Sequence, residues 1–195
     1  MTRRILAATV LAAAFAVAAP AQAAVDLDNL NPPPPDWYSC QATGSGAVCH
    51  GSHDGGHQGA PDGSCPQGFD ILEDAFSTQT AKRVYDRNGD LVERVLHDRW
   101  AHDPRNIIYN SVTGKSVPYW GSGNERDTFT VPGDFDSIVA RTSGNGYTVT
   151  VPGVGLLIKD AGRLDFGPDG NVIEMRGPKM LFLGQTEKLC AVLAS

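Results

Sequence analysis

Short apolar runs alternate with turn residues from Phe69 to the C-terminus. The clearest run, residues 147–151, alternates Tyr or Val with Thr, which is the period of a strand with one buried face. We expect further strands at comparable runs, namely residues 69–72, 79–87, 91–100, 106–109, 116–120, 128–131, 137–142, 155–159, 163–166 and 171–175. Because no long segment has the 3.6-residue period of an amphipathic helix, the pattern predicts an all-β protein.

Tight turns separate most of these runs. Asn88-Gly89 is a strong signal for a short hairpin because both residues tolerate positive φ. Further turn signals are Pro132-Gly133, the Ser-Gly-Asn-Gly stretch at 143–146, and Pro168-Asp169-Gly170. These connections are too short for the crossover helices of βαβ units. We therefore expect an antiparallel meander that forms a barrel or a sandwich.

The C-terminus carries the one helical signal. Thr186 is a suitable N-cap for a short helix over residues 187–193. In that helix Leu189, Cys190 and Leu193 would share the face that turns toward the β domain.

The chain before Phe69 reads differently. A leader, residues 24–36, contains four consecutive prolines at 32–35, which favour a polyproline II helix. Such a run docks on a partner, acts as a stiff spacer, or lies along the surface of its own domain. Residues 37–40 and 47–49 predict a small hairpin around the turn at 43–46, and residues 50–68 read as a Gly-rich loop.

The first 23 residues have the features of a secretory signal peptide. Arg3 and Arg4 precede an apolar run at 5–19, and Ala21-Gln22-Ala23 matches the small-x-small cleavage pattern. Cleavage after Ala23 would leave the β domain outside the cell. The alternative is an uncleaved anchor, which the short, Ala-rich run disfavours. No membrane span is expected in the rest of the chain.

Composition excludes several classes of protein. The chain has 195 residues, of which 41% are hydrophobic and 19% charged, so a disordered tail or a polytopic membrane protein is not expected. The 22 glycines and 13 prolines suit many short strands joined by tight turns. The formal net charge of -6 and the lack of a Lys/Arg cluster argue against a nucleic-acid partner.

The four cysteines, Cys40, Cys49, Cys65 and Cys190, all lie beyond the signal peptide. In an oxidising compartment an even set favours disulfides, and four cysteines allow three pairings. We favour Cys40–Cys49, which closes a small loop, and Cys65–Cys190, which ties the start of the domain to its end. Redox or zinc chemistry ranks lower because no Cys-x-x-Cys occurs.

Two histidine groups are candidate sites for chemistry. His50, His53 and His57 are possible zinc or copper ligands, with Asp54 as a residue that orients one of them, although a Gly-rich loop does not hold three rings in place. His97, Asp98 and His102 are weak catalytic candidates, because a His–Asp pair can act as a general base. Solvated surface histidines are the alternative in both cases, and no nucleophile signature accompanies them.

Acidic and aromatic residues add two weaker hypotheses. Asp86, Asn88 and Asp90 alternate as in the first half of a calcium loop, but Leu91 stands where that loop needs Gly, so a hairpin explains them better. No spacing points to a paired-carboxylate glycosidase. Aromatic residues either pack in an ordinary core or line a barrel mouth that binds a small apolar ligand, namely Trp100, Tyr109, Tyr119, Trp120, Phe129 and Tyr147.

Several motifs follow one another in a set order: Cys40-Gln41 and the Gly-rich turn to Cys49, Phe69-Asp70-Ile71-Leu72, Tyr85-Asp86-Arg87-Asn88-Gly89, Thr113-Gly114-Lys115, Val151-Pro152-Gly153-Val154-Gly155, Asp160-Ala161-Gly162-Arg163, Pro168-Asp169-Gly170 and Cys190. This order resembles a large set of small secreted β-rich proteins of Gram-positive bacteria that have no assigned function. The resemblance covers most of the chain after the signal peptide. It implies secretion and a β-rich domain, and it implies no substrate, cofactor or active-site residue.

Three functional hypotheses follow from these observations. The leading one is a secreted, non-enzymatic β domain that binds a small ligand, a wall polymer or a protein outside the cell, with no cofactor. The second is a secreted hydrolase that uses a metal at His50, His53 and His57, or the residues His97, Asp98 and His102. The third is a structural module that is presented to other proteins by the proline-rich leader.

Overall fold

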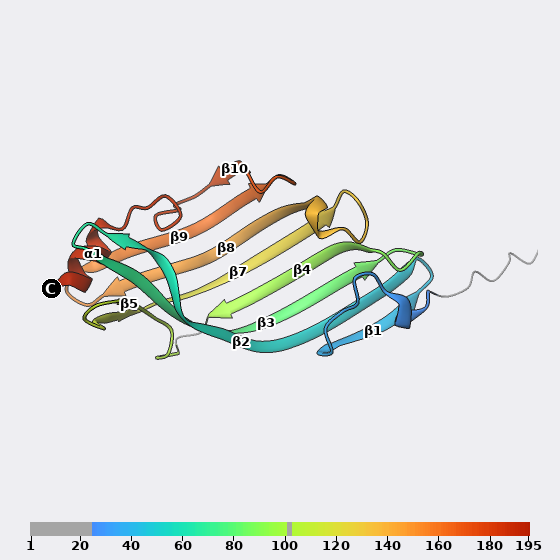
Figure 1. Ribbon diagram of the computed structural model, residues 1–195, viewed down its shortest axis with the longest axis horizontal. Helices are drawn as coiled ribbons and strands as arrows, with labels where there is room; N and C mark the ends of the chain where they lie inside the picture. The colour runs from blue at the N-terminus through green and yellow to red at the C-terminus, as the bar shows by residue number, and fades with distance from the viewer. Residues whose placement is uncertain (1–24, 101–102) are drawn as a thin grey trace, which may run out of the picture.

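The computed structural model describes residues 25–100 and 103–195, and the expected signal peptide lies outside these residues (Figure 1). Within these residues ten strands form one antiparallel sheet, and the C-terminus forms a short helix. The strands are β1 (Tyr38–Thr43), β2 (Gly46–Cys65), β3 (Phe69–Tyr85), β4 (Leu91–Trp100), β5 (Ile107–Asn110), β6 (Ser116–Pro118), β7 (Trp120–Phe129), β8 (Ile138–Val151), β9 (Gly155–Phe166) and β10 (Val172–Arg176). The helices are the 3-10 turns η1 (Leu27–Asn29) and η2 (Phe135–Ser137) and the α-helix α1 (Glu187–Ala194). The expected all-β antiparallel fold with one short C-terminal helix is confirmed.

The sheet is open. Its strand order is β1-β2-β3-β4-β7-β8-β9-β10, and the hairpin β5–β6 branches from β3. Among the described residues β1 pairs with β2 alone and β10 with β9 alone, so the two edges are not joined. The barrel expectation is therefore wrong, because short runs and turns are equally compatible with closed and open sheets.

The strands are fewer and longer than expected. Residues 50–65, predicted as a Gly-rich loop, form most of β2 and pair along almost their whole length with β3. The 143–146 stretch, predicted as a turn, lies inside β8, where the register with β9 shifts between Gly144 and Tyr147. Both predictions are wrong for one reason: glycine inside a strand often marks a bulge or a close backbone approach, and sequence alone does not distinguish it from glycine in a turn.

One face of the sheet, the inner face, carries two separate apolar clusters. It includes Ala75, Ala81 and Tyr85 of β3. The helix-end core contains Cys65, Phe69, Ile71, Ala75, Ile108, Val117, Tyr119, Val149, Leu157, Ile158, Leu189, Cys190 and Leu193. The leader-end core contains Leu30, Ala47, Cys49, Tyr85, Leu91 and Phe129. Helix α1 and the β5–β6 hairpin contribute to the first core and the leader contributes to the second, so the inner face has a cover at each end.

The leader lies along the domain, as one of the sequence alternatives expected. Leu30 is 5% exposed within the leader-end core. The Tyr85 hydroxyl donates a hydrogen bond to the Pro32 carbonyl at 2.9 Å, and Arg83 donates to the Pro33 carbonyl at 3.3 Å. Pro32 and Pro33 are therefore held against β3 through their carbonyl groups, which remain acceptors although proline has no N–H.

Helix α1 buries Leu189, Cys190 and Leu193, as predicted. Thr186 occupies the predicted N-cap position. Its side chain makes no capping hydrogen bond, so the expectation that Thr186 caps the helix through its hydroxyl is wrong. The predicted disulfides Cys40–Cys49 and Cys65–Cys190 are both present. Within the described part of the chain, no helix is long and apolar enough to cross a membrane.

Candidate functional site

Between its two cores the inner face carries a transverse line of directly paired residues. His53 pairs with Gln79, Gln79 with Asp98, and Asp98 with Gly123. The line continues from Gly123 to Gly144 and from Gly144 to Gly162, and so crosses six strands from β2 to β9. Residues directly opposite in an antiparallel ladder point to the same face, so this central row belongs to one surface.

Half of the central row has no side chains. Gly144 has φ 131°, and a Cβ there would lie 2.5 Å from the Ser122 carbonyl oxygen. At Gly162, where φ is 101°, a Cβ would lie 2.2 Å from the Arg176 carbonyl oxygen. These two positions therefore require glycine. In the row, β7, β8 and β9 contribute glycines, with the Trp100 ring beside Gly123, while β2, β3 and β4 carry polar side chains. We call this surface, the central row together with Trp100, the trough.

Two hollows open along the trough and share Asp98 and Trp100. The first, of about 250 Å³, is also lined by His53, His57 and Gln79. The second, of about 180 Å³, is also lined by Glu125, Thr142, Gly144 and Lys179. Because Asp98 and Trp100 line both, the hollows form one elongated site rather than two unrelated depressions.

The shared pair combines an apolar ring with a fixed carboxylate. The Gln79 side-chain amide donates a hydrogen bond to Asp98 at 3.0 Å, which holds the carboxylate and leaves it acceptor capacity. The Trp100 ring stacks on Tyr147 with centroids 6.3 Å apart, and Tyr147 stacks in turn on Tyr119 at 5.1 Å. The tryptophan is thus supported from the helix-end core, which fixes the ring in the trough.

A cluster of acidic and hydroxyl groups lies at the helix end of the trough; we call Asp62, Glu73, His57, Tyr119 and Tyr147 the acid cluster. Glu73 on β3 is 3% exposed. The Tyr147 hydroxyl lies 2.7 Å from both Glu73 carboxylate oxygens, and His57 Nε2 lies 3.4 Å from Glu73 Oε2. Asp62 sits in the register shift of β2 between Pro61 and Gly63, and such bulges re-aim a side chain.

The acid cluster holds a proton near neutral pH. Burial, together with the charge of Glu73, raises the pKa of Asp62 from 3.8 to about 7, while His57 opposes the shift. Burial also raises the pKa of Tyr147 and of Tyr119, with Glu73 adding to both shifts. Among the described residues the buried Asp62 Oδ2 has no hydrogen-bond partner. The Asp62 carboxyl therefore holds its proton more tightly than an exposed aspartate does, because the buried site also contains the Glu73 carboxylate.

This shift predicts a stability that falls as pH rises. The folded protein holds the Asp62 proton more tightly than the unfolded chain, so its contribution is complete below pH 3.8 and is lost as pH rises through about 7. Because Asp62 is partly exposed, we expect a loss of about 1 kcal/mol in the free energy of unfolding between pH 5 and pH 8, roughly half the unscreened value. Urea unfolding at pH 5 and pH 8 measures it.

Asp62→Asn should remove most of that pH dependence, since its side chain does not titrate. Asp54→Asn is the matched control, because Asp54 lies on the same strand, is exposed and accepts a hydrogen bond from Thr78. A wild-type protein whose stability does not fall between these pH values, or an equal effect of both variants, would contradict the raised pKa of Asp62.

The predicted metal trio is not brought together. His50 and His53 lie on opposite faces of β2, because side chains alternate along a strand without a register shift between them. His53 stacks on Trp37 at 5.5 Å, while His53 and His57 both line the larger hollow. Within residues 25–100 and 103–195, no group of three or more His, Cys, Asp or Glu side chains could hold a metal ion.

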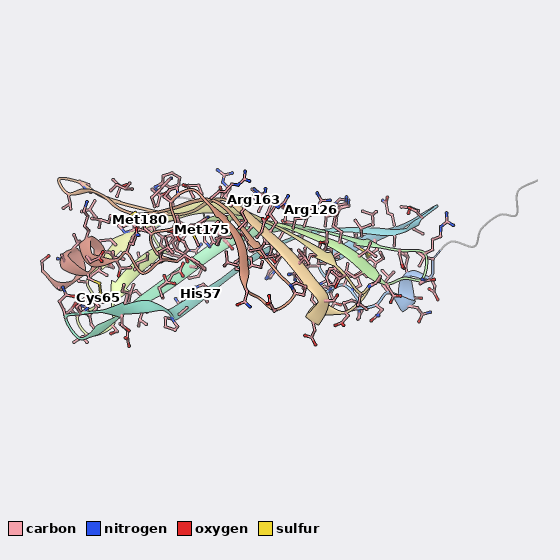
Figure 2. The ribbon with its side chains drawn as sticks, turned by 90° about the horizontal axis from the view of Figure 1, so that it is seen from above. His57, Cys65, Arg126, Arg163, Met175 and Met180 are labelled. Carbon is pink, nitrogen blue, oxygen red and sulfur yellow. A yellow bond between two sulfur atoms is a disulfide. The ribbon has the colours of Figure 1, made fainter. Side chains whose placement is uncertain are left out.

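The predicted catalytic trio is also divided. His97 lies on the outer face, where its Nδ1 is 2.7 Å from the Asn124 side-chain oxygen. Asp98 follows it in β4 and therefore points into the trough. His102 lies outside the described residues. In Figure 2 the outer face is marked by the labelled side chains of Arg126 and Arg163, which lie on the opposite side of the sheet from His57.

Other candidates have structural roles. Asp86 closes the hairpin turn by accepting hydrogen bonds from the backbone amides of Asn88 and Asp90, as the turn hypothesis expected. Of the six aromatic residues proposed for a barrel mouth, Trp100, Tyr119 and Tyr147 form the stack at the trough. Phe129 belongs to the leader-end core instead.

The sequence interpretation missed Asp62, Glu73 and Lys179. One signal for Glu73 was available: it stands between Ile71 and Ala75 in the alternation of β3, at a position where a buried apolar residue is expected. A charged residue in the buried register marks a partnered or functional group. Asp62 and Lys179 lie outside any regular alternation, so no comparable signal exists for them.

Comparison of the chain with protein-family models, with curated proteins and with solved structures found no match.

Proposed function

We propose that this protein is a secreted, non-enzymatic domain that binds an extended, hydroxyl-rich polymer, a glycan such as a wall polysaccharide, in the trough. The observation that carries the proposal is the stretch of inner face between the two covers. There Trp100 stands beside Asp98 in both hollows, next to a floor of glycines.

The chemistry of the trough suits a sugar chain. A pyranose ring has an apolar C–H face that packs on an aromatic ring, and its hydroxyls hydrogen-bond to carboxylate and amide groups. Trp100 supplies the ring, and Asp98 and Gln79 supply the polar groups. An elongated site across six strands fits several sugar units better than one compact ligand.

Secretion is part of the proposal and has separate support. The first 23 residues match a signal peptide, and two disulfides stabilise the domain. Disulfides persist in oxidising compartments, where a wall polymer is accessible.

Trp100→Ala should weaken glycan binding at least tenfold, because it removes the apolar surface on which a sugar ring packs. Isothermal titration of the purified protein with hexamers of glucose, N-acetylglucosamine and galacturonate measures this effect. Trp120→Ala is the matched control, since this exposed tryptophan lines neither hollow of the trough. Equal affinity of the two variants, or no binding of any hexamer up to about 1 mM, would exclude the proposal.

One observation favours a hydrolase as the second candidate. His57 and Ser77 line the same hollow, and His57 contacts Glu73, which resembles the components of a nucleophile, a base and an orienting acid. No hydrogen bond joins Ser77 to His57 among the described residues, so the histidine does not activate this serine there. Labelling of Ser77 by a fluorophosphonate probe, lost in Ser77→Ala, would support the hydrolase over the binding domain.

A further inference from the structure

Lys179 is a buried lysine that lines the trough. Lys179 is 8% exposed, and its backbone forms an isolated antiparallel bridge with Asp160 of β9. Asp160 is paired with Tyr147, so its side chain faces inward and that of Lys179 does likewise. The Lys179 side chain lines the smaller hollow together with Asp98 and Trp100.

Lys179 has no counter-charge of its own. Among the described residues no carboxylate forms an ion pair with its ammonium group and no acceptor is hydrogen-bonded to it. The neighbouring carboxylate, Asp160, instead accepts hydrogen bonds from the backbone amides of Leu181 at 2.8 Å and Phe182 at 3.3 Å. Most of the residue is buried, but its Nζ is not one of the buried side-chain atoms that lack a partner among the described residues. The ammonium group is therefore open to the hollow, where a bound anion can pair with it.

The surroundings leave room for such a molecule. Gly144 and Gly146 line the hollow beside Lys179, and neither carries a side chain that would cover the ammonium group. Burial lowers the pKa of Lys179, and the charge of Asp160 only partly opposes this effect. A bound anion would raise the pKa of Lys179 again, because a negative charge nearby favours the charged form of the lysine.

We infer that the polymer bound in the trough carries an anionic group, a carboxylate or a phosphate, that pairs with Lys179 in the smaller hollow. This inference rests on the proposed glycan-binding function and adds the charge of the ligand to it. Asp98 and Glu125 line the same hollow, but Glu125 is paired with Arg94 at 2.9 Å. Asp98 is therefore the carboxylate that can accept hydrogen bonds from the ligand's hydroxyl groups, while Lys179 pairs with its anionic group. A ligand with both groups on one sugar unit would satisfy both side chains.

The test compares ligands that differ only in charge. Galacturonate hexamers are titrated against their methyl esters, and glycerol phosphate hexamers against glycerol oligomers, so that the two arms distinguish carboxylate from phosphate. We expect at least tenfold tighter binding of one anionic oligomer than of its neutral counterpart.

Lys179→Met should abolish this preference, since methionine fills the same space without the charge. Lys179→Arg should retain it, because the guanidinium keeps the positive charge, and Lys188→Met, on the exposed side of α1, should leave it unchanged. Thermal unfolding of each variant confirms that it is folded.

The outcomes separate the two proposals. Equal binding of charged and neutral oligomers, or a preference that persists in folded Lys179→Met, would overturn the role of Lys179 and leave glycan binding intact. Absence of binding by every oligomer would contradict the proposed function itself and this inference with it.

Discussion

Replacement of both Cys65 and Cys190 by serine should lower the free energy of unfolding by about 5 kcal/mol. The two cysteines are 125 residues apart, so their disulfide closes most of the domain into one loop. In the chain-entropy account the benefit comes from restricting the unfolded chain, and it grows slowly with loop length. The bridge also joins the end of β2 to α1, which contributes to the cover of the helix-end core. Urea unfolding under non-reducing conditions measures the loss.

The second disulfide provides the matched control. Cys40 and Cys49 are 9 residues apart, and the same reasoning gives about 2–3 kcal/mol for the corresponding double serine variant. Both pairs contain a fully buried cysteine, Cys190 or Cys49, so the cost of burying a serine hydroxyl is similar in the two variants. Equal losses for the two variants would show that loop length does not govern their contributions.

Leu189→Ala should lower the free energy of unfolding by about 3 kcal/mol, the second-largest effect expected. Leu189 is fully buried in the helix-end core, where truncation removes packing and leaves a cavity that the surrounding sheet cannot fill. An eight-residue helix is not stable in isolation, so α1 depends on this contact for its helical structure.

Lys188→Ala is the control on the same helix, because Lys188 is exposed and its truncation should change stability by less than about 0.5 kcal/mol. Comparison of the urea midpoints of the two variants tests the prediction. A Leu189→Ala protein as stable as Lys188→Ala would show that α1 is not part of the cooperative core.

Much of the fold was accessible from local patterns. The period-2 run at 147–151, the turn at Asn88-Gly89 and the apolar spacing of Leu189 and Leu193 each correspond to an observed element. These signals depend on the chain's own stereochemistry and on the alternation of buried and exposed positions, which do not require knowledge of distant residues. The predicted disulfide pairs were also correct.

The errors share a different origin. Residues 50–65 contain few apolar residues and many glycines, so nothing local identifies them as a strand, yet β3 provides a pairing partner along β2. The histidines of this segment were consequently placed in a loop, where three rings can converge, instead of on a strand that sends His50 and His53 to opposite faces. Strand pairing across the sheet therefore makes residues 50–65 a strand, and that strand separates His50 from His53, as the metal hypothesis did not expect.

The candidate site lies beyond local reasoning for a similar reason. Asp62 and Glu73 lie on the paired strands β2 and β3, but Tyr147 is 74 residues beyond Glu73 and reaches it only because the sheet folds its strands together. Lys179 is a candidate because no acceptor pairs with its ammonium group in the described structure, although it lines a hollow. Asp98 is a candidate because strand pairing places it in the row that crosses six strands. Neither property can be read from neighbouring residues in the sequence.

Residue order alone was sufficient for the secondary-structure class, most turns, the C-terminal helix and the cross-links, since these arise from interactions between near neighbours and from the chemistry of cysteine. Whether the sheet closes, which stretch of its inner face stays uncovered, and which charges share that stretch depended on the folded protein. Those properties are set by pairing and packing between residues far apart in the chain, whose positions relative to one another no local pattern contains.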